Sequence, residues 1–207
     1  KLLQENAAEI RRRTDREIQI THVGTRRPRP DLTLANSVKQ SADLMDIVRQ
    51  PDVDVVVEVM GGIHPAYELI MEAMKHGKHV VTANKALLAE HGTALFKAAD
   101  EYKVQIAYEA AVAGGIPIIK VIREGLAANR IDWLAGIING TGNFILSEMR
   151  EKGRTFEDVL KEAQELGYAE ADPTFDVEGI DAAHKLTLLA SIAFGIPLQF
   201  DKVFTEG

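Results

Sequence analysis

The fold of this chain is constrained most strongly by an alternation of strand-like and helix-like segments over its first 110 residues. The segments with helical spacing of apolar residues separate the strand-like runs and are long enough to connect neighbouring strands of one sheet. Such connections are right-handed crossovers, so the strands that they join run parallel. We therefore expect strands at Ile18–Val23, Val53–Met60, His79–Thr82 and Val104–Glu109.

The helices between these strands have recognisable ends. Pro51 ends the helix expected at Asp43–Gln50, a proline opens the one at Pro65–Lys75, and the third is expected at Lys85–Asp100. The run Val53–Met60 is almost entirely apolar, which is typical of a strand buried on both faces. We interpret residues 1–110 as a partial Rossmann-type, dinucleotide-binding domain in an α/β fold.

The pattern changes beyond residue 110, where strands become scarce and helices become long. The small-residue run Ala110–Pro117 is interpreted as a loop, and Asn139–Asn143 as a turn that follows a strand expected at Ile131–Ile138. We expect residues 111–207 to form an α+β domain that binds the substrate. Its helices are predicted at Ile118–Ala127, Phe144–Glu151, Phe156–Leu166 and Ile180–Phe194.

Composition excludes several classes of site and partner. The chain has no cysteine, which excludes disulfides, thiolate metal sites and a cysteine nucleophile, and which fits a cytoplasmic location. Its net charge of −7 comes without a basic surplus, so we expect no nucleic-acid partner. The longest apolar stretch, Leu186–Ile196, is too short and too mixed to cross a membrane, and the N-terminus has no secretory signal.

The nucleotide-binding prediction depends on secondary signals, because the sequence has no G-x-G-x-x-G turn. We expect that turn to lie upstream of Lys1. The loop after the strand Ile18–Val23 carries Arg26 and Arg27 and no acid, which favours the 2′-phosphate of NADP over the free ribose of NAD. A solvated basic loop explains the same residues equally well.

Two further features lie at the carboxyl ends of predicted strands, where open α/β sheets bind their ligands. Gly61 and Gly62 follow one strand and allow a close approach of the backbone to a ribose or nicotinamide. Lys85 follows the next strand and would point towards the same crevice. A tight turn with positive φ is the alternative for the glycines, and a solvent-exposed position is the alternative for the lysine.

The segment Gly167–Lys185 is dense in carboxylates and ends on one lysine. Asp181 and Lys185 are four residues apart on a predicted helix and share one face. A surface ion pair, with acids that complement the helix dipole, explains part of this pattern. It does not explain a long loop in which acids flank Tyr168 and Phe175. The loop acids are Glu170, Asp172 and Asp176.

Carboxylates held near one lysine suit a hydride-transfer enzyme. They bind an ammonium group, orient a water or tune the proton affinity of the lysine. When hydride reaches a carbonyl carbon, the new alkoxide must be protonated, and a positioned lysine can act as that general acid. From its residues alone, the chain is therefore interpreted as a nicotinamide-dependent oxidoreductase that acts on a small molecule.

Four motifs give the chain a specific resemblance. They are VVTANKALLAEHG (80–92), YEAAVAGGIPII (108–119), INGTGNFIL (138–146) and GYAEADPTFDVEGIDAAHKL (167–186). With these motifs the chain resembles homoserine dehydrogenases over nearly its whole length. The resemblance implies interconversion of L-aspartate 4-semialdehyde and L-homoserine with NADP or NAD, on the route to threonine and methionine.

The resemblance also implies roles for individual residues. Lys185 is similar to the family's proton donor, and Asp181 to the group that holds the reacting oxygen or its water. Glu170 resembles the acid that binds the substrate amino group, and Asp176 a further acid of the substrate site. Lys85 resembles the lysine where cofactor and substrate meet.

Two loops take on roles through the same resemblance. Asn139, Gly140 and Thr141 look like the substrate loop before a helix N-terminus, which suits a carboxylate. Residues 109–116 resemble a site for a monovalent cation, Na⁺ or K⁺. The oxygen donors of this cation site would be Glu109, Val112, Gly114 and Ile116.

The resemblance further implies a homodimer. Residues 111–207 are expected to form its interface, in which Ile131–Ile138 pairs across a two-fold axis.

Two other interpretations of the sequence remain. The helix and strand that contain Gly77-Lys78-His79-Val80 resemble a unit of Rossmann oxidoreductases that oxidise sugars, although those enzymes usually continue with Lys-Pro and this chain has Asn84-Lys85. A ligand-binding module without catalysis is the second, since fold does not determine function. The combination of carboxylates and lysine favours an enzyme, because a binding module needs no general acid.

Overall fold

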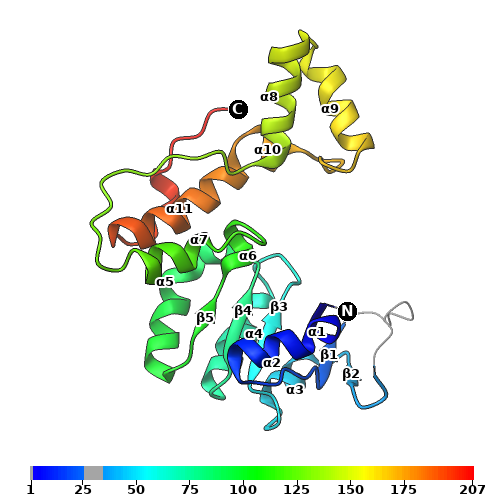
Figure 1. Cartoon of the computed structure of the whole chain (residues 1–207), viewed down its shortest axis with the longest axis vertical. Helices are drawn as coiled ribbons and strands as arrows, with labels where there is room; N and C mark the ends of the chain where they lie inside the picture. Colours follow the sequence, from blue (N-terminus) through cyan, green and yellow to red (C-terminus); the bar gives the residue numbers. More distant parts are fainter. Residues whose placement is uncertain (1, 26–34) are drawn as a thin grey trace.

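The computed structural model describes residues 2–25 and 35–207 (Figure 1). Its strands form two parallel sheets, one of order β1-β2 and one of order β3-β4-β5. The predicted α/β fold with a parallel sheet is confirmed. The strands are β1 (His22–Gly24), β2 (Lys39–Ser41), β3 (Val55–Glu58), β4 (His79–Thr82) and β5 (Ile106–Ala107).

The helices that connect these strands begin where the sequence provides caps. The Asp43 side chain accepts a hydrogen bond from Asp46 N at the start of α3, and the Asn84 side chain accepts one from Leu87 N at the start of α5. The helices of this half are α1 (Leu2–Glu5), α2 (Ala7–Thr14), α3 (Leu44–Arg49), α4 (Ala66–Lys75) and α5 (Lys85–Tyr102). The three predicted helices are thus present, while β1 is shorter than expected and β2 had no sequence signal.

Within the described part of the chain, helices cover one face of the three-stranded sheet and leave the other exposed. The prediction that the strand within Val53–Met60 is buried on both faces is therefore wrong. Val80 is 1% exposed and packs with α4 and α5, whereas Val57 is 62% exposed. Successive strand residues point to opposite faces, and both helices lie against the same one. The other face presents Val55, Val57, Val59 and Val81.

Helices dominate the second half, as predicted, but its predicted strand is absent. Residues 130–139 have no regular secondary structure, and within the described ranges Ile131–Ile138 pairs with no strand. An apolar run becomes a strand only when a neighbouring strand accepts its backbone hydrogen bonds. The expected turn at Asn139–Asn143 is instead the capped start of a helix. The helices are α6 (Glu109–Val112), α7 (Ile118–Lys120), η1 (Val121–Gly125), α8 (Gly140–Lys152), α9 (Phe156–Glu165), α10 (Thr174–Val177), α11 (Ile180–Phe194) and η2 (Phe200–Lys202).

One hydrophobic core joins the sheet to the second half through α11. Leu188 and Leu189 of that helix are buried in the same core as Ile70 and Leu88, which come from α4 and α5. The α8–α9 hairpin has a small core of its own around Val159 and stands away from the sheet, with α11 between them (Figure 1). The start of α11 is therefore held near the start of α5.

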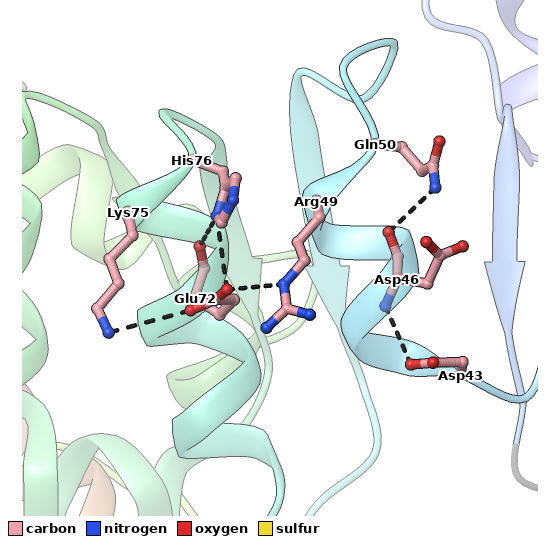
Figure 2. A network of polar contacts seen from close by, with 7 residues as sticks. All are labelled: Asp43, Asp46, Arg49, Gln50, Glu72, Lys75 and His76. Atoms are coloured by element: carbon pink, nitrogen blue, oxygen red, sulfur yellow. Dashed lines mark hydrogen bonds and ion pairs between the residues drawn. The ribbon is translucent and has the colours of Figure 1, made fainter.

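A polar network on the surface joins α3 to α4 (Figure 2). Glu72 accepts a hydrogen bond of 2.8 Å from Arg49 Nε, and it also lies within ion-pair distance of Lys75 and His76. The hydrogen bond from Arg49 lowers the pKa of Glu72 below its usual value.

No helix in the described part of the chain is long and apolar enough to cross a membrane.

Candidate active site

The first turn of α11 brings a buried carboxylate beside a lysine. Gly179, with a φ of 72°, precedes the helix and leads the chain into it. Asp181 and Lys185 then lie one turn apart, and their Oδ2 and Nζ atoms are 2.6 Å apart. Asp181 is only 6% exposed, so this contact is not the surface ion pair that remained possible from the sequence.

A second lysine reaches the same carboxylate from the other half of the chain. Lys85 is the first residue of α5, and its Nζ lies 3.1 Å from Asp181 Oδ1. Each oxygen of Asp181 therefore binds one ammonium group. Asn84 caps α5 and sets where this helix starts, and it thereby determines the position of Lys85, the first residue of the helix.

Asn139, expected as part of the substrate loop, contacts two acids of this site, a link that no sequence pattern indicated. Its Nδ2 donates hydrogen bonds to Asp176 Oδ1 at 2.7 Å and to Asp181 Oδ2 at 2.9 Å. Its Oδ1 accepts from Gly142 N and caps α8. The neighbouring carbonyl, Ile138 O, accepts a hydrogen bond of 2.8 Å from Lys185 Nζ.

Electrostatics keep the central carboxylate ionised. Burial alone would raise the pKa of Asp181, but the hydrogen bonds from Lys185, Asn139 and Lys85 outweigh it and lower that pKa below its usual value. An ionised Asp181 between two lysines fixes the direction of both side chains. The arrangement can orient a lysine towards a reacting oxygen, as a general acid requires.

A cavity of about 540 Å³ lies next to Lys185. Gly140 and Asn139 line it on the side of α8, and apolar side chains such as Leu189 line much of the rest. Three of the four residues expected to hold a cation also line it. These three are Val112, Gly114 and Ile116.

The fourth expected cation ligand, Glu109, has another partner in the structure. Its carboxylate accepts hydrogen bonds from Ile119 N at 2.7 Å and Lys120 N at 3.2 Å, at the end of α7. Ile116 O also accepts a hydrogen bond, from Ile118 N. Since each of these oxygens has further lone pairs, the loop remains compatible with a cation while being held by the chain's own N–H groups.

The remaining substrate-site predictions fall at different distances from the cluster around Asp181. Asp176 joins it through Asn139. Glu170 is exposed, and its backbone carbonyl accepts a hydrogen bond from Gln164 Nε2. Thr141 is buried and its hydroxyl donates to Tyr168 O at 2.8 Å, which joins α8 to the acidic segment.

The glycine turn after β3 is held by a buried carboxylate, Glu58, which was not among the predicted site residues. Glu58 is 3% exposed; one oxygen accepts from Gly61 N and the other from Thr82 Oγ1 at 2.6 Å. Asn84 Nδ2 donates to Gly62 O at 2.6 Å, so this turn is connected to the start of α5. The signal in the sequence was an acid inside an apolar strand.

The two glycines have positive φ values of 72° and 74°, as the alternative explanation by a tight turn required. A Cβ atom at Gly61 would meet nothing within 4 Å, so backbone conformation rather than crowding requires glycine there. The turn lies at the carboxyl end of β3, which is where a nucleotide binds in this type of sheet. Arg26 and Arg27, the basis of the NADP prediction, lie outside the described residues.

Comparison with known proteins identifies the family. The family model for the NAD-binding domain of homoserine dehydrogenase matches residues 1–109, and the model for homoserine dehydrogenase matches residues 117–207. Enzymes named homoserine dehydrogenase from Pseudomonas aeruginosa and Neisseria gonorrhoeae are 66% and 55% identical over the whole chain. This chain spans 47% of each, about half of their length.

Solved structures of homoserine dehydrogenases are also similar to this chain. The homoserine dehydrogenase of Thiobacillus denitrificans superposes with a TM-score of 0.94 at 60% identity, covering all of this chain and 48% of that one. A hyperthermophilic archaeal homoserine dehydrogenase in complex with NADPH has a TM-score of 0.70 at 34% identity, covering 75% of this chain and 48% of that one. The chain therefore belongs to the homoserine dehydrogenase family.

Proposed function

We propose that the intact protein is an NAD(P)-dependent homoserine dehydrogenase. It interconverts L-aspartate 4-semialdehyde and L-homoserine, in the biosynthesis of threonine and methionine. The observation that carries the proposal is the Asp181 carboxylate, which binds Lys85 Nζ and Lys185 Nζ together within a chain of this family. We place the activity in the cytoplasm, with no nucleic-acid or membrane partner.

Lys185 is the general acid of the proposed reaction. When the aldehyde is reduced, its oxygen becomes an alkoxide and takes a proton from Lys185 Nζ; in the oxidation Nζ accepts the hydroxyl proton. Asp181 and Ile138 O hold Nζ in place for this transfer. The nicotinamide, when bound, supplies the hydride in one direction and accepts it in the other.

The residues predicted for the substrate site suit the two charged ends of an amino acid. Glu170 and Asp176 are proposed to bind the ammonium group of the substrate, because carboxylates are its strongest hydrogen-bond partners in a protein. Gly140 and Thr141 open α8, a helix of 13 residues, and are proposed to bind the substrate carboxylate through the N-terminal turn.

The nicotinamide cofactor is proposed to lie along the carboxyl ends of β3 and β4. The open space at Gly61, its positive φ and the connection of Gly62 to Asn84 support a preformed turn at that place. Lys85 would contact the cofactor near the reacting carbon. Arg26 is proposed to select NADP over NAD; unchanged NADP affinity in Arg26→Ala would remove this assignment.

A monovalent cation is proposed to bind the loop of residues 109–116. Carbonyl oxygens of Val112, Gly114 and Ile116 and an oxygen of Glu109 are hard donors, which suit Na⁺ or K⁺. The loop lines the cavity beside Lys185, and this proximity supports a role in the site. Equal activity in sodium, potassium and tetramethylammonium buffers would exclude it.

The reaction is tested by assaying the intact protein with L-homoserine and NADP. We expect the parent to oxidise L-homoserine and Lys185→Ala to lose roughly 10²–10⁴-fold in kcat, the usual contribution of a general acid. Lys161→Ala, at an exposed lysine of α9, is the matched control and should keep the parent's rate. A parent that oxidises sugars but not homoserine would overturn the proposed function. Turnover of Lys185→Ala within about tenfold of the parent would overturn only the role of Lys185.

A further inference from the structure

We propose that Asn139 is a positioning residue that keeps Asp176, Asp181 and Lys185 in their relative positions. The inference rests on the proposed function, since it concerns how that site is assembled. It starts from the position of Asn139 between three elements: its backbone precedes α8, and its side chain reaches an acid of α10 and an acid of α11. Among the contacts of the described residues, this single amide joins Asp176 to Asp181.

The Nδ2 group of Asn139 does what no carboxylate or hydroxyl can do at the same position. It donates two hydrogen bonds, one to Asp176 and one to Asp181, and so bridges two acids. Two carboxylates brought together repel each other, and a shared donor offsets that repulsion. The hydrogen bond from Asn139 is also one of the contacts that lower the pKa of Asp181.

The peptide before Asn139 holds the proposed proton donor. Ile138 O accepts from Lys185 Nζ at 2.8 Å, while Lys185 Nζ also contacts Asp181 Oδ2. The carboxylate oxygen that Asn139 holds is therefore the same oxygen that binds Lys185. A shift of the turn at residues 138–139 would move the lysine and both acids together.

A purely structural explanation is that Asn139 only caps α8. Capping uses Oδ1, which accepts from Gly142 N, and serine or aspartate would cap a helix about as well. Neither of them provides the two N–H donors that reach the acids. The two roles of the side chain are thus carried by different atoms, and substitutions can separate them.

The test uses Asn139→Ser in the intact enzyme, because serine keeps the cap and removes the two N–H donors of the amide. We expect kcat for L-homoserine oxidation to fall about tenfold to a hundredfold, as for the loss of hydrogen bonds to charged groups, with the KM for NADP unchanged. The acidic limb of the pH profile of kcat/KM should move to higher pH, since Asp181 loses a contact that lowers its pKa. The melting temperature should stay near that of the parent.

Asn139→Asp and Thr155→Ala complete the set. Asn139→Asp keeps the cap but adds a third carboxylate, so it should lower kcat further and move the same pH limb further. Thr155 caps α9 through Asp158 N, away from the lysines, and Thr155→Ala should lower the melting temperature without changing kcat or the pH profile.

The outcomes distinguish this inference from the proposed function. If the parent does not oxidise L-homoserine, the proposed function is wrong and the inference falls with it. If the parent is active and Asn139→Ser keeps its kcat and pH profile, only the inference on Asn139 is wrong. If Asn139→Ser loses thermal stability and all kinetic constants change together, the residue is structural.

Discussion

At the scale of single residues, Asp181 combines deep burial with a carboxylate that stays ionised. Its pKa is lowered although burial opposes this, because three side chains donate hydrogen bonds to it. A group whose pKa is lower in the folded than in the unfolded protein stabilises the fold above its unfolded value of about 3.9. That contribution is lost as the pH falls through the folded pKa.

The lowered pKa of Asp181 leads to a prediction for Asp181→Asn. The substitution should lower the free energy of unfolding at pH 7 by about 3 kcal/mol, as when one partner of a buried ion pair is removed. The difference from the parent should shrink as the pH falls below about 3.9, because the unfolded parent then binds a proton on Asp181 that the folded parent, with its lowered pKa, does not yet bind. Urea unfolding of both proteins at several pH values measures it. A difference that does not change with pH would show that the charge of Asp181 is not what stabilises the fold.

At the scale of elements, α11 carries both the site and part of the core on different faces. Asp181 and Lys185 point towards α5 and the turn at residues 138–139. Leu188 is 1% exposed in the core shared with the sheet, and Leu186 is 38% exposed. The helix thus ties the position of the lysine to the packing of the core.

We predict that Leu188→Ala and Leu186→Ala differ strongly although they remove the same atoms two residues apart. Leu188→Ala should lower the free energy of unfolding by about 2–5 kcal/mol, because it leaves a cavity in a packed core. Leu186→Ala should cost less than about 1 kcal/mol, as usual at exposed positions. Denaturant unfolding of the pair measures this difference. Similar costs at both positions would contradict the proposed packing of α11.

At the scale of the whole molecule, residues 130–139 before α8 pair with no strand in the described part of the chain. Trp133 and Ile137 are 77% and 81% exposed there, in a stretch that the sequence predicts as a strand. An irregular segment with exposed apolar side chains and no strand pairing is suited to pairing with a second copy. If the intact protein is the homodimer that the family resemblance implies, we expect its interface at this segment.

The corresponding prediction is that Ile137→Asp converts the intact protein from a dimer to a monomer at micromolar concentration. A charge in the centre of an apolar interface is left without a partner when two copies meet. Sedimentation velocity measures the change. Leu166→Asp, at a 53% exposed residue after α9, is the control and should keep the parent's assembly. A parent that sediments as a monomer, or an Ile137→Asp dimer, would exclude this interface.

Local patterns in the sequence were sufficient for much of the fold and for one pair in the site. Proline, glycine and capping residues mark the helices α4 and α5, and the spacing of four residues puts Asp181 beside Lys185. These features depend on neighbours along the chain, so periodicity and end signals reveal them. Family motifs added roles for Lys85, Glu170 and Asp176 as expectations without a geometry.

Contacts between distant segments were decided by the tertiary structure alone. No local rule indicates that Lys85 reaches Asp181, that Asn139 bridges two acids, or that Glu58 holds the glycine turn. The same holds for the face of the sheet that stays exposed at Val57 and for the predicted strand that found no partner. Hydrogen bonds and burial of this kind need two groups that meet in space. The sequence by itself determines which groups are present, and only the tertiary structure determines which distant groups meet.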